Sequence, residues 1–314
     1  MPPKIVIICG PTATGKTKLG VALAKHLNGE VVSADSMQIY RHMAIGTARP
    51  SEEEMEGIPH HMMAIVDPDE NYSVARYVEE ASARVDDILA RGKVPILVGG
   101  TGLYIDALCA GRTFSAFRPE SGCRERLQKI AAQGGLPRLW KDLQGIDPEA
   151  AEKLHPNDEK RIIRALEVWY ETGETITQHN RRTRAIPPRY EALTIALTYR
   201  DRQALYDRID RRVDGMMDQG LVEEVRNLLA MGIPKECTAM QAIGYKEMVE
   251  AVVNHGDIQA AAEEVKLRSR QYAKRQLTWF RRNKEAHWIY LENDPNFPAV
   301  VQNSTNFLRW KGLP

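Results

Sequence analysis

A glycine-rich stretch near the N-terminus has the spacing of a phosphate-binding loop. Residues 10–17 read GPTATGKT, which fits the pattern G-x-x-x-x-G-K-[ST], and they follow the apolar run 5–8. A strand that leads through such a loop into a helix turns backbone N–H groups toward oxygen anions. Lys16 adds a positive charge, and Thr17 offers a hydroxyl to Mg²⁺ at the start of the helix. The sequence therefore predicts a polyphosphate site, without indicating whether a phosphoryl group is transferred.

An acid and an amide follow the next strand-like run, residues 30–34. The segment 30–38 reads EVVSADSMQ, with Asp35 and Gln38 just beyond the expected strand. Ligands of doubly wound sheets bind beyond the carboxyl ends of the strands, so we expect both side chains near the phosphate loop. Asp35 could orient Mg²⁺, as acids do in nucleoside triphosphatases. The amide of Gln38 could read an adenine edge, because it offers a donor and an acceptor together.

A second glycine-rich turn ends the strand predicted at 94–98, since residues 94–104 read VPILVGGTGLY. A motor ATPase usually carries an acidic residue at this strand end. Its absence from the sequence argues against that class and against a nucleotide-switch protein. The glycines permit close backbone approach, and Thr101 places a hydroxyl near the strand end. A plain strand-to-helix turn is the alternative interpretation.

Two arginines share one face of a helix predicted over 202–230. Arg208 and Arg212 stand four residues apart in a segment whose apolar stripe includes Leu205 and Ile209. Like charges at this spacing repel by roughly a few tenths of a kcal/mol unless an anion lies between them. The pair is therefore a second candidate phosphate ligand, with a solvated helix face as the alternative.

Basic residues are clustered although the formal net charge is only +1. One cluster, Arg181, Arg182 and Arg184, is expected in a loop ahead of Pro187 and Pro188. The segment 266–284 contains eight basic residues and no acidic one: Lys266, Arg268, Arg270, Lys274, Arg275, Arg281, Arg282 and Lys284. Locally basic surfaces on a nearly neutral protein indicate a polyanion site such as nucleic acid, and solvated helix faces are the alternative.

Strand-like and helix-like patterns alternate along most of the chain. Strands are predicted at 4–9, 30–34, 94–98, 193–199 and 286–291, and helices at 16–27, 73–91 and 202–230. This alternation is typical of an α/β fold with a parallel sheet flanked by helices on both faces. With the loop at 10–17, the sequence predicts a fold of the P-loop NTPase type.

The pattern changes to short helices without a convincing strand in one internal region, which predicts an all-helical insertion. The predicted domains are a core of residues 1–113 and 191–314 and an insertion of residues 114–190. Within the insertion, Asp147 before Pro148 is expected to cap a helix. A further helix over 158–172 is expected to begin at Asn157 or Asp158 and to end at Gly173.

Composition indicates a soluble cytoplasmic protein. The chain has 314 residues, 43% apolar and 27% charged, which is enough to bury a sizeable core. No stretch approaches the ~18 apolar residues of a membrane span, and the N-terminus runs directly into a predicted strand. Cys9, Cys109, Cys123 and Cys237 form no C-x-x-C pair, so we expect reduced cysteines and neither a zinc site nor a disulfide framework.

Together these residues resemble the tRNA dimethylallyltransferases, in their short bacterial form. The resemblance covers nearly the whole chain and rests on six motifs in order: GPTATGKT at 10–17, DSMQ at 35–38, GGTGLY at 99–104, HPND with RIIRALEV at 155–168, LYDRIDRRVD at 205–214 and QAIGYKE at 241–247. The family implies that the loop holds the diphosphate of dimethylallyl diphosphate rather than ATP. It also implies an insertion that clamps the anticodon stem-loop, and a channel where the flipped adenine meets the prenyl chain.

The resemblance also assigns roles to individual residues. It implies transfer of a dimethylallyl group to N6 of the adenosine 3′ of the anticodon (position 37) in tRNA, with Mg²⁺ on Thr17, and we expect a monomer. The implied catalytic residues are Asp35, Thr101 and Arg208. The implied diphosphate ligands are Gly10, Thr12, Ala13, Thr14, Gly15, Lys16 and Thr17. The implied tRNA contacts are Asp35, Ser36, Met37, Gln38, Thr101, Cys123, Glu159, Lys160, Arg161, Ile162, Ile163, Gln241, Ala242, Ile243, Gly244, Tyr245, Lys246, Lys274, Arg275 and Arg281.

The chemistry of this reaction suits the residues. Adenine N6 is a poor nucleophile because its lone pair is delocalised, so a carboxylate such as Asp35 would help by accepting the N6 proton as the C–N bond forms. Lys16, the loop amides, Arg208 and Thr17 with Mg²⁺ would stabilise the departing diphosphate. Thr101 could hydrogen-bond N6 or a diphosphate oxygen. The base must leave its stack, which the insertion and the basic helix would have to support.

A small-molecule or nucleoside kinase is the main alternative. It would use the same loop with ATP as donor, and Asp35 would activate a hydroxyl. The two basic clusters argue against it, because they are too extensive for a small acceptor.

Overall fold

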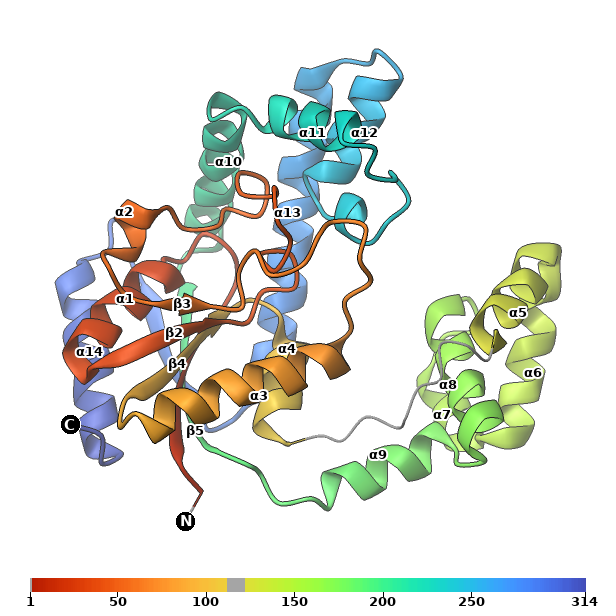
Figure 1. Ribbon diagram of the computed structural model, residues 1–314, viewed down its shortest axis with the longest axis horizontal. Coiled ribbons are helices and arrows are strands. Elements are labelled where there is room, and N and C mark those ends of the chain that lie inside the picture. The colour runs from red at the N-terminus through yellow and green to blue at the C-terminus, as the bar shows by residue number, and fades with distance from the viewer. Residues whose placement is uncertain (1, 112–121) are drawn as a thin grey trace. The chain divides into compact units, whose positions relative to one another are not determined.

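The computed structural model describes residues 2–111 and 122–314, and the chain divides into two compact units (Figure 1). One unit comprises Met1–Cys109 and Arg189–Pro314, and the other comprises Ala110–Pro188. The second boundary falls at Pro188 rather than at residue 190. The first predicted boundary, at residue 113, lies outside the described residues.

Six parallel strands form the sheet of the core unit. Their spatial order is β3-β2-β4-β1-β5-β6, and every neighbouring pair is parallel. The strands are β1 Lys4–Cys9, β2 Gly29–Ser33, β3 His60–His61, β4 Val94–Gly99, β5 Glu191–Tyr199 and β6 His287–Leu291. The predicted α/β fold and its five strands are confirmed, with strand ends shifted by at most two residues. The short edge strand β3 was not predicted.

Some helices of the core unit cover this sheet, and others pack on one another beyond it (Figure 1). They are α1 Lys16–Leu27, α2 Glu52–Met55, α3 Val74–Ala90, α4 Gly102–Cys109, α10 Arg202–Asp218, α11 Leu221–Ala230, α12 Tyr245–Val253, α13 Ile258–Phe280 and α14 Phe297–Trp310, with a 3₁₀ turn at Ala239–Gln241. The single helix predicted over 202–230 is wrong, because Gly220 interrupts it. Gly220 has a φ of 98° and forms the N-cap of α11, in a left-handed conformation that favours glycine. Within the described residues, no helix is both long and apolar enough to cross a membrane.

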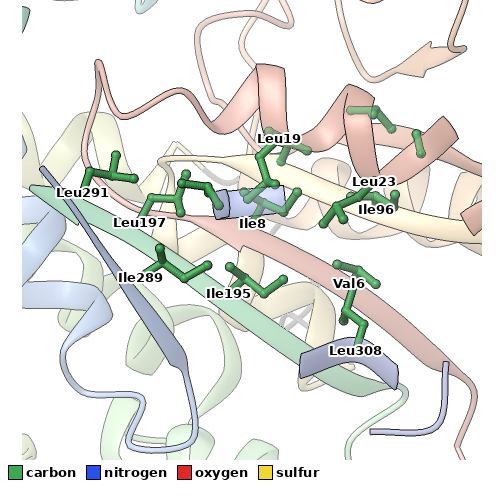
Figure 2. Packing of buried hydrophobic residues seen from close by; sticks show 14 of the residues in the cluster. Val6, Ile8, Leu19, Leu23, Ile96, Ile195, Leu197, Ile289, Leu291 and Leu308 are labelled. Carbon is green, nitrogen blue, oxygen red and sulfur yellow. The ribbon is translucent and has the colours of Figure 1, made fainter. Parts of the chain in front are cut away.

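Helices α1 and α14 and the first half of α10 cover one face of the sheet. Figure 2 shows Leu19 and Leu23 of α1 and Leu308 of α14 near strand residues that include Val6 and Ile195. All five are buried. Because parallel strands are buried on both faces, they read as the continuous apolar runs from which the strands were predicted. This packing places the start of α1 beside the end of β1.

Helices α3 and α4 cover the opposite face. Tyr77 of α3 and Tyr104 of α4 stack with ring centroids 4.0 Å apart. The Tyr77 hydroxyl donates a hydrogen bond to the carbonyl of Ser33 at 3.0 Å, at the end of β2. A third apolar cluster joins the chain after β2, including Ile39 and Met43, to helices α10–α13. The segment that follows β2 is therefore held from both sides.

The regular secondary structure in the described part of the insertion unit is helical. Its helices are α5 Cys123–Ile130, α6 Leu136–Ile146, α7 Pro148–Lys153, α8 Glu159–Thr172 and α9 Ile176–Arg184, with a π-helical segment at Ala131–Gly135. The predicted caps are confirmed. Asp147 accepts from the N–H of Ala150 at 3.1 Å, Asp158 caps α8, and Gly173 ends it with a φ of 71°. Apolar side chains such as Leu143 and Leu166 form a separate core for this unit.

The basic cluster 181–184 lies in α9 and not in a loop, so that prediction is wrong. Thr175 and Gln178 form a capping box in which each side chain accepts from the other's backbone N–H, at 3.0 and 3.1 Å. The helix therefore starts at Ile176 and continues to Arg184. The prolines that follow disfavour helical geometry in the residue before them, so the helix ends before them. They do not prevent the residues ahead of them from forming a helix.

Candidate active site at the carboxyl ends of the strands

The loop after β1 has the backbone conformation of a phosphate-binding nest. Gly10 has a φ of 138°, and a Cβ there would lie 2.2 Å from the carbonyl oxygen of Leu197 on β5. Gly15, with a φ of 79°, is the N-cap of α1, and Ala13 also has a positive φ of 64°. The Thr14 hydroxyl donates to the carbonyl of Pro11 at 2.9 Å. The glycine spacing thus serves close approach to β5 and the turn into α1.

Lys16, Arg212 and Asp35 influence one another electrostatically at this loop. Burial lowers the pKa of Lys16 to about 8, the positive charge of Arg212 adds to this effect, and Asp35 acts in the opposite direction. Burial also lowers the pKa of Arg212, while Asp35 raises it. The Lys16 ammonium donates to the carbonyl of Pro11 at 2.7 Å. An anion bound here would relieve the repulsion between the two cations.

Arg208 lies near the end of β5. Its guanidinium carbon is 5.6 Å from the ring centroid of Tyr199, the last residue of that strand. Within the described residues, the buried Nε of Arg208 has no hydrogen-bond partner. A buried donor of this kind needs an acceptor, and a phosphate oxygen is one suitable acceptor.

Asp35 and Thr101 belong to one hydrogen-bonded turn beyond β2 and β4. Asp35 Oδ1 accepts from the N–H of Met37 at 2.9 Å and from the N–H of Gln38 at 3.4 Å. The Thr101 hydroxyl accepts from the N–H of Ser36 at 3.0 Å. These bonds fix the carboxylate and the hydroxyl relative to each other at the carboxyl ends of two neighbouring strands. Both side chains are partly exposed.

The Gln38 amide is buried and bonded within the protein. Its Oε1 accepts from the Ser33 hydroxyl at 3.0 Å, and its Nε2 lies 3.2 and 3.4 Å from the carbonyls of Ala48 and Thr47. In this arrangement Gln38 supports the loop 44–48. Recognition of adenine by Gln38 stays a prediction, and it would require these bonds to be exchanged.

Glu224 of α11 supports the same loop from the other side, which the sequence did not predict. Its carboxylate accepts from the N–H groups of Ala44, Ile45 and Gly46 at 2.8, 2.9 and 3.0 Å and from the Tyr245 hydroxyl at 2.6 Å. A Cβ at Gly46 would lie 2.5 Å from the Tyr245 ring. Tyr245, in the motif at 241–247, is completely buried, and its hydroxyl is connected to this loop through Glu224.

The glycines after β4 permit the close approaches that the sequence predicted. A Cβ at Gly99 would lie 2.2 Å from the carbonyl oxygen of Ala34, after β2. A Cβ at Gly102 would lie 2.2 Å from the ring of Trp279, on α13. The turn that carries Thr101 is therefore pressed between the end of β2 and helix α13.

The basic run 266–284 separates into a paired part and an unpaired part. Lys266 pairs with Asp214 and Glu263 at 2.6 and 2.8 Å, Arg268 pairs with Glu264 at 2.6 Å, and Arg270 pairs with Asp210 at 2.6 Å. The acids come from α10 and from the preceding turn of α13, so the absence of acids inside the run was misleading. The predicted tRNA contacts Lys274, Arg275 and Arg281 are exposed and have no ion pair within the described residues.

The other predicted tRNA contacts, in the insertion and in the motif at 241–247, differ in their exposure to solvent. Glu159, Lys160 and Arg161 are exposed at the start of α8. Cys123, Ile162 and Ile163 are buried in the core of that unit, so their side chains are unavailable to a ligand in this conformation. In α9, Arg181 pairs with Glu149, and Arg182 pairs with Glu174 at 2.9 Å. In the core unit, Gln241 and Lys246 are exposed, Ala242 and Ile243 are partly buried, and Gly244 is buried.

Thr17 fits a magnesium site that the protein only partly supplies. Its side chain is partly exposed in the first turn of α1. Within the described residues, no group of three or more His, Cys, Asp or Glu side chains could hold a metal ion. Mg²⁺ at phosphate sites is commonly held by one or two protein oxygens, water and the substrate phosphates. A single hydroxyl beside the loop 10–17 would suit that chemistry if a phosphate were bound there.

Comparison with known proteins gives the same family over nearly the whole chain. A family model described as IPP transferase matches residues 38–283. Curated tRNA dimethylallyltransferases from Thermoanaerobacter sp. (strain X514) and Caldanaerobacter subterraneus subsp. tengcongensis are 47% and 48% identical over 309 residues, covering 98% of this chain and 98% of each relative.

Solved structures are similar over both units. The full-length tRNA isopentenylpyrophosphate transferase from Bacillus halodurans has a TM-score of 0.74 at 42% identity, with 98% of this chain and 96% of that chain covered. A eukaryotic dimethylallyltransferase acting on tRNA has a TM-score of 0.82 at 30% identity, with 98% and 80% covered. The chain therefore belongs to the IPP transferase family of enzymes, as its motifs predicted.

Proposed function

We propose that this chain transfers a dimethylallyl group from dimethylallyl diphosphate to N6 of the adenosine 3′ of the anticodon, position 37 of tRNA, and releases diphosphate. The match to curated relatives carries the proposal, together with the charges of Lys16, Arg212 and Asp35, which act on one another. Two cations that an anion would stabilise lie in the field of a carboxylate that can accept a proton. Relatives named tRNA dimethylallyltransferase support this choice of substrates.

The diphosphate binds to the loop 10–17, Lys16 and Arg208. As the bond between carbon and oxygen breaks, negative charge grows on the leaving oxygen. Donors that are already oriented stabilise that charge without reorganisation, which lowers the barrier to transfer. The Nε of Arg208 gains an acceptor when the diphosphate binds. Thr17 would hold Mg²⁺, which supplies further neutralisation of the departing diphosphate.

Asp35 accepts the proton of N6 as N6 attacks the prenyl carbon. A C–N bond forms, the C–O bond to diphosphate breaks, and one N6 proton passes to the carboxylate. Oδ1 is held by the N–H of Met37, which orients the carboxylate toward its acceptor role. Thr101, whose hydroxyl accepts from the N–H of Ser36, hydrogen-bonds the base or the diphosphate in this proposal.

The RNA backbone lies along the exposed cations of the core unit, among them Lys246, Lys274, Arg275 and Arg281. Lys160 and Arg161 of α8 provide cations on the insertion unit. Phosphate contacts of this kind position the nucleic acid without reading its sequence. The target base leaves its stack, because N6 cannot reach the prenyl carbon from inside a stacked loop.

The choice of donor tests the proposal. The chain is incubated with bulk bacterial tRNA, Mg²⁺ and either dimethylallyl diphosphate or ATP, and the RNA is digested to nucleosides. We expect an adenosine heavier by one prenyl group with dimethylallyl diphosphate and no change with ATP. Phosphate transfer from ATP to a small acceptor, without prenylated nucleoside, would instead favour the kinase alternative.

A further inference from the structure

Helix α13 places an amide between the two loops of the candidate site. Gln276 is 5% exposed and comes from the face of the helix that also carries Tyr272 and Trp279. Its Oε1 accepts from the backbone N–H of Thr12, in the phosphate loop, at 3.0 Å. Its Nε2 donates to the carbonyl of Gly100, beside Thr101, at 3.0 Å. One side chain therefore bonds to both loops at once.

The surroundings of Gln276 leave little freedom. A Cβ at Gly100 would lie 2.1 Å from Nε2, so a side chain at residue 100 would displace the amide. Tyr272 lies one helical turn before Gln276. Burial raises the pKa of Tyr272 to about 12, and its contacts with Thr101 and Gln276 act in the opposite direction. The neighbouring Trp279 donates to Asp106 of α4 at 3.0 Å and fixes the next turn of α13.

We propose that Gln276 is a positioning residue that sets the separation and orientation of the diphosphate loop and the Asp35–Thr101 turn. The inference rests on the proposed function, in which the donor sits on the first loop and the accepting N6 sits at the turn. Alkyl transfer needs the two substrates aligned, and a displacement of about 1 Å can cost on the order of 10²-fold in rate. At neutral pH an uncharged amide supplies the acceptor and the donor that this bridge needs.

Two substitutions separate positioning from packing. Gln276→Met keeps the length of the side chain and removes both hydrogen bonds. Gln276→Glu keeps an acceptor for the Thr12 N–H, but its ionised form repels the Gly100 carbonyl. When that carboxyl is protonated it regains a donor, so it can imitate the amide. The matched control is Gln271→Met, the same exchange at an exposed position of the same helix.

The experiment measures steady-state prenyl transfer by the full chain as a function of pH. For Gln276→Met we expect kcat to fall on the order of 10²-fold, with KM for both substrates within about threefold, and no change for Gln271→Met. The activity of Gln276→Glu relative to wild type should rise as the pH falls, whereas that of Gln276→Met should stay flat. Should Gln276→Met fail to fold, the pH profile of Gln276→Glu alone decides the matter.

Two results would overturn the positioning role. One is an unchanged kcat in Gln276→Met, and the other is a Gln276→Glu ratio that does not depend on pH. Hydrogen exchange of the Thr12 amide gives a measure independent of activity, because the bridge predicts faster exchange in Gln276→Met than in Gln271→Met. Wild-type activity in the same assay tests the proposed function separately, so the two failures can be distinguished.

Discussion

Asp35 combines a fixed carboxylate oxygen with an electrostatic influence on Lys16 of the loop 10–17. Oδ1 accepts from the N–H groups of Met37 and Gln38, and an asparagine at this position keeps an oxygen able to accept both bonds. Asp35→Asn therefore preserves the turn and removes the charge. If Asp35 is the general base, turnover should fall on the order of 10²–10⁴-fold, with KM for both substrates little changed.

Single-turnover rates measured against Mg²⁺ concentration separate this role from a metal-orienting one. A carboxylate that orients Mg²⁺ predicts a higher KM for the diphosphate substrate and partial recovery of Asp35→Asn at high Mg²⁺. A general base predicts no such recovery. Recovery would indicate that Asp35 orients Mg²⁺ rather than acting as the base, and it would strengthen the kinase alternative.

We expect Lys16 to make diphosphate binding depend on pH. Its pKa is lowered to about 8 by burial and by Arg212, and only its protonated form offers a charge to the anion. The dissociation constant for inorganic diphosphate should therefore rise as the pH increases through about 8. The ligand titrates as well, so the informative quantity is the difference from Lys16→Arg, which stays charged throughout. Calorimetric titrations from pH 7 to pH 9 that gave parallel curves for the two proteins would contradict this role.

At the residue scale, sequence motifs predicted side chains and loops whose partners lie close to them in the chain. The loop 10–17 could be predicted because glycine spacing and a flanking strand are contiguous in the chain. Glu224 and Gln276 could not, because their partners at residues 44–46, 12 and 100 are distant in sequence. Gln38 shows a related limit, since its hydrogen bonds to the Ser33 hydroxyl and the Ala48 carbonyl could not be predicted from its amide type, and recognition of a base by Gln38 stays a prediction.

At the scale of elements, Glu30 ties the edge of the sheet together. This buried residue of β2 bonds to Arg91 after α3 at 2.8 Å, to Lys93 before β4 at 2.7 Å and to His61 of β3 at 2.8 Å. The hydrogen bonds from Arg91 hold the pKa of Glu30 well below its usual range, with Lys93 and His61 contributing and burial opposing. The carboxylate therefore stabilises the fold in its ionised form.

The pH dependence of stability follows from this shift. Because the folded pKa of Glu30 is depressed, its contribution is present above about pH 4.5 and is lost as the pH falls toward the folded pKa. Glu30→Gln should lower the free energy of unfolding by about 2 kcal/mol at pH 7. The difference from wild type should shrink below pH 4.5.

Urea unfolding at pH 7 and pH 4 measures both effects. The control is Glu292→Gln, whose ion pair with Arg200 is 69% exposed on both sides and should contribute less than about 0.5 kcal/mol. Equal losses in the two variants, or a Glu30→Gln difference that does not depend on pH, would show that the buried cluster adds no stability through its charge.

Elements were predictable where their signals are local. Strands buried on both faces gave apolar runs, and caps such as Asp147 and Gly173 fixed helix ends. The division of the segment 202–230 into two helices could not be predicted, because its apolar periodicity continues across Gly220 although the chain turns there. Strand β3 has only two residues, which is too short for an apolar pattern. It is defined by its pairing with β2, which the sequence does not show.

At the scale of the whole molecule, the charge distribution matters more than the net charge of +1. Ion pairs with α10 and with the first half of α13 itself neutralise the start of the basic run, which leaves Lys274 and Arg281 among the exposed cations. The double substitution Lys274→Gln with Arg281→Gln should weaken tRNA binding. It should also reduce the slope of log K against log salt by about 0.7–0.9 per residue and leave diphosphate affinity intact.

The matched control replaces two exposed cations that are already paired. Arg268 and Arg200 form ion pairs with Glu264 and Glu292, so Arg268→Gln with Arg200→Gln should change the salt slope much less. Filter-binding or fluorescence titrations from 50 to 200 mM salt, roughly the range over which phosphate contacts are resolved, provide the slopes. Equal slopes in the two double variants would remove this end of α13 from the RNA interface.

The most direct test of the account is the stoichiometry of transfer to a defined RNA. The full chain is incubated with dimethylallyl diphosphate, Mg²⁺ and an anticodon stem-loop that carries either adenosine or guanosine at the position 3′ of the anticodon. Mass spectrometry of the nucleosides and an assay for released diphosphate are run on the same samples. The account predicts one prenyl group on N6 of that adenosine and one diphosphate per RNA, and neither product with guanosine. Prenyl transfer to the guanosine RNA, or diphosphate release without a modified adenosine, would contradict it.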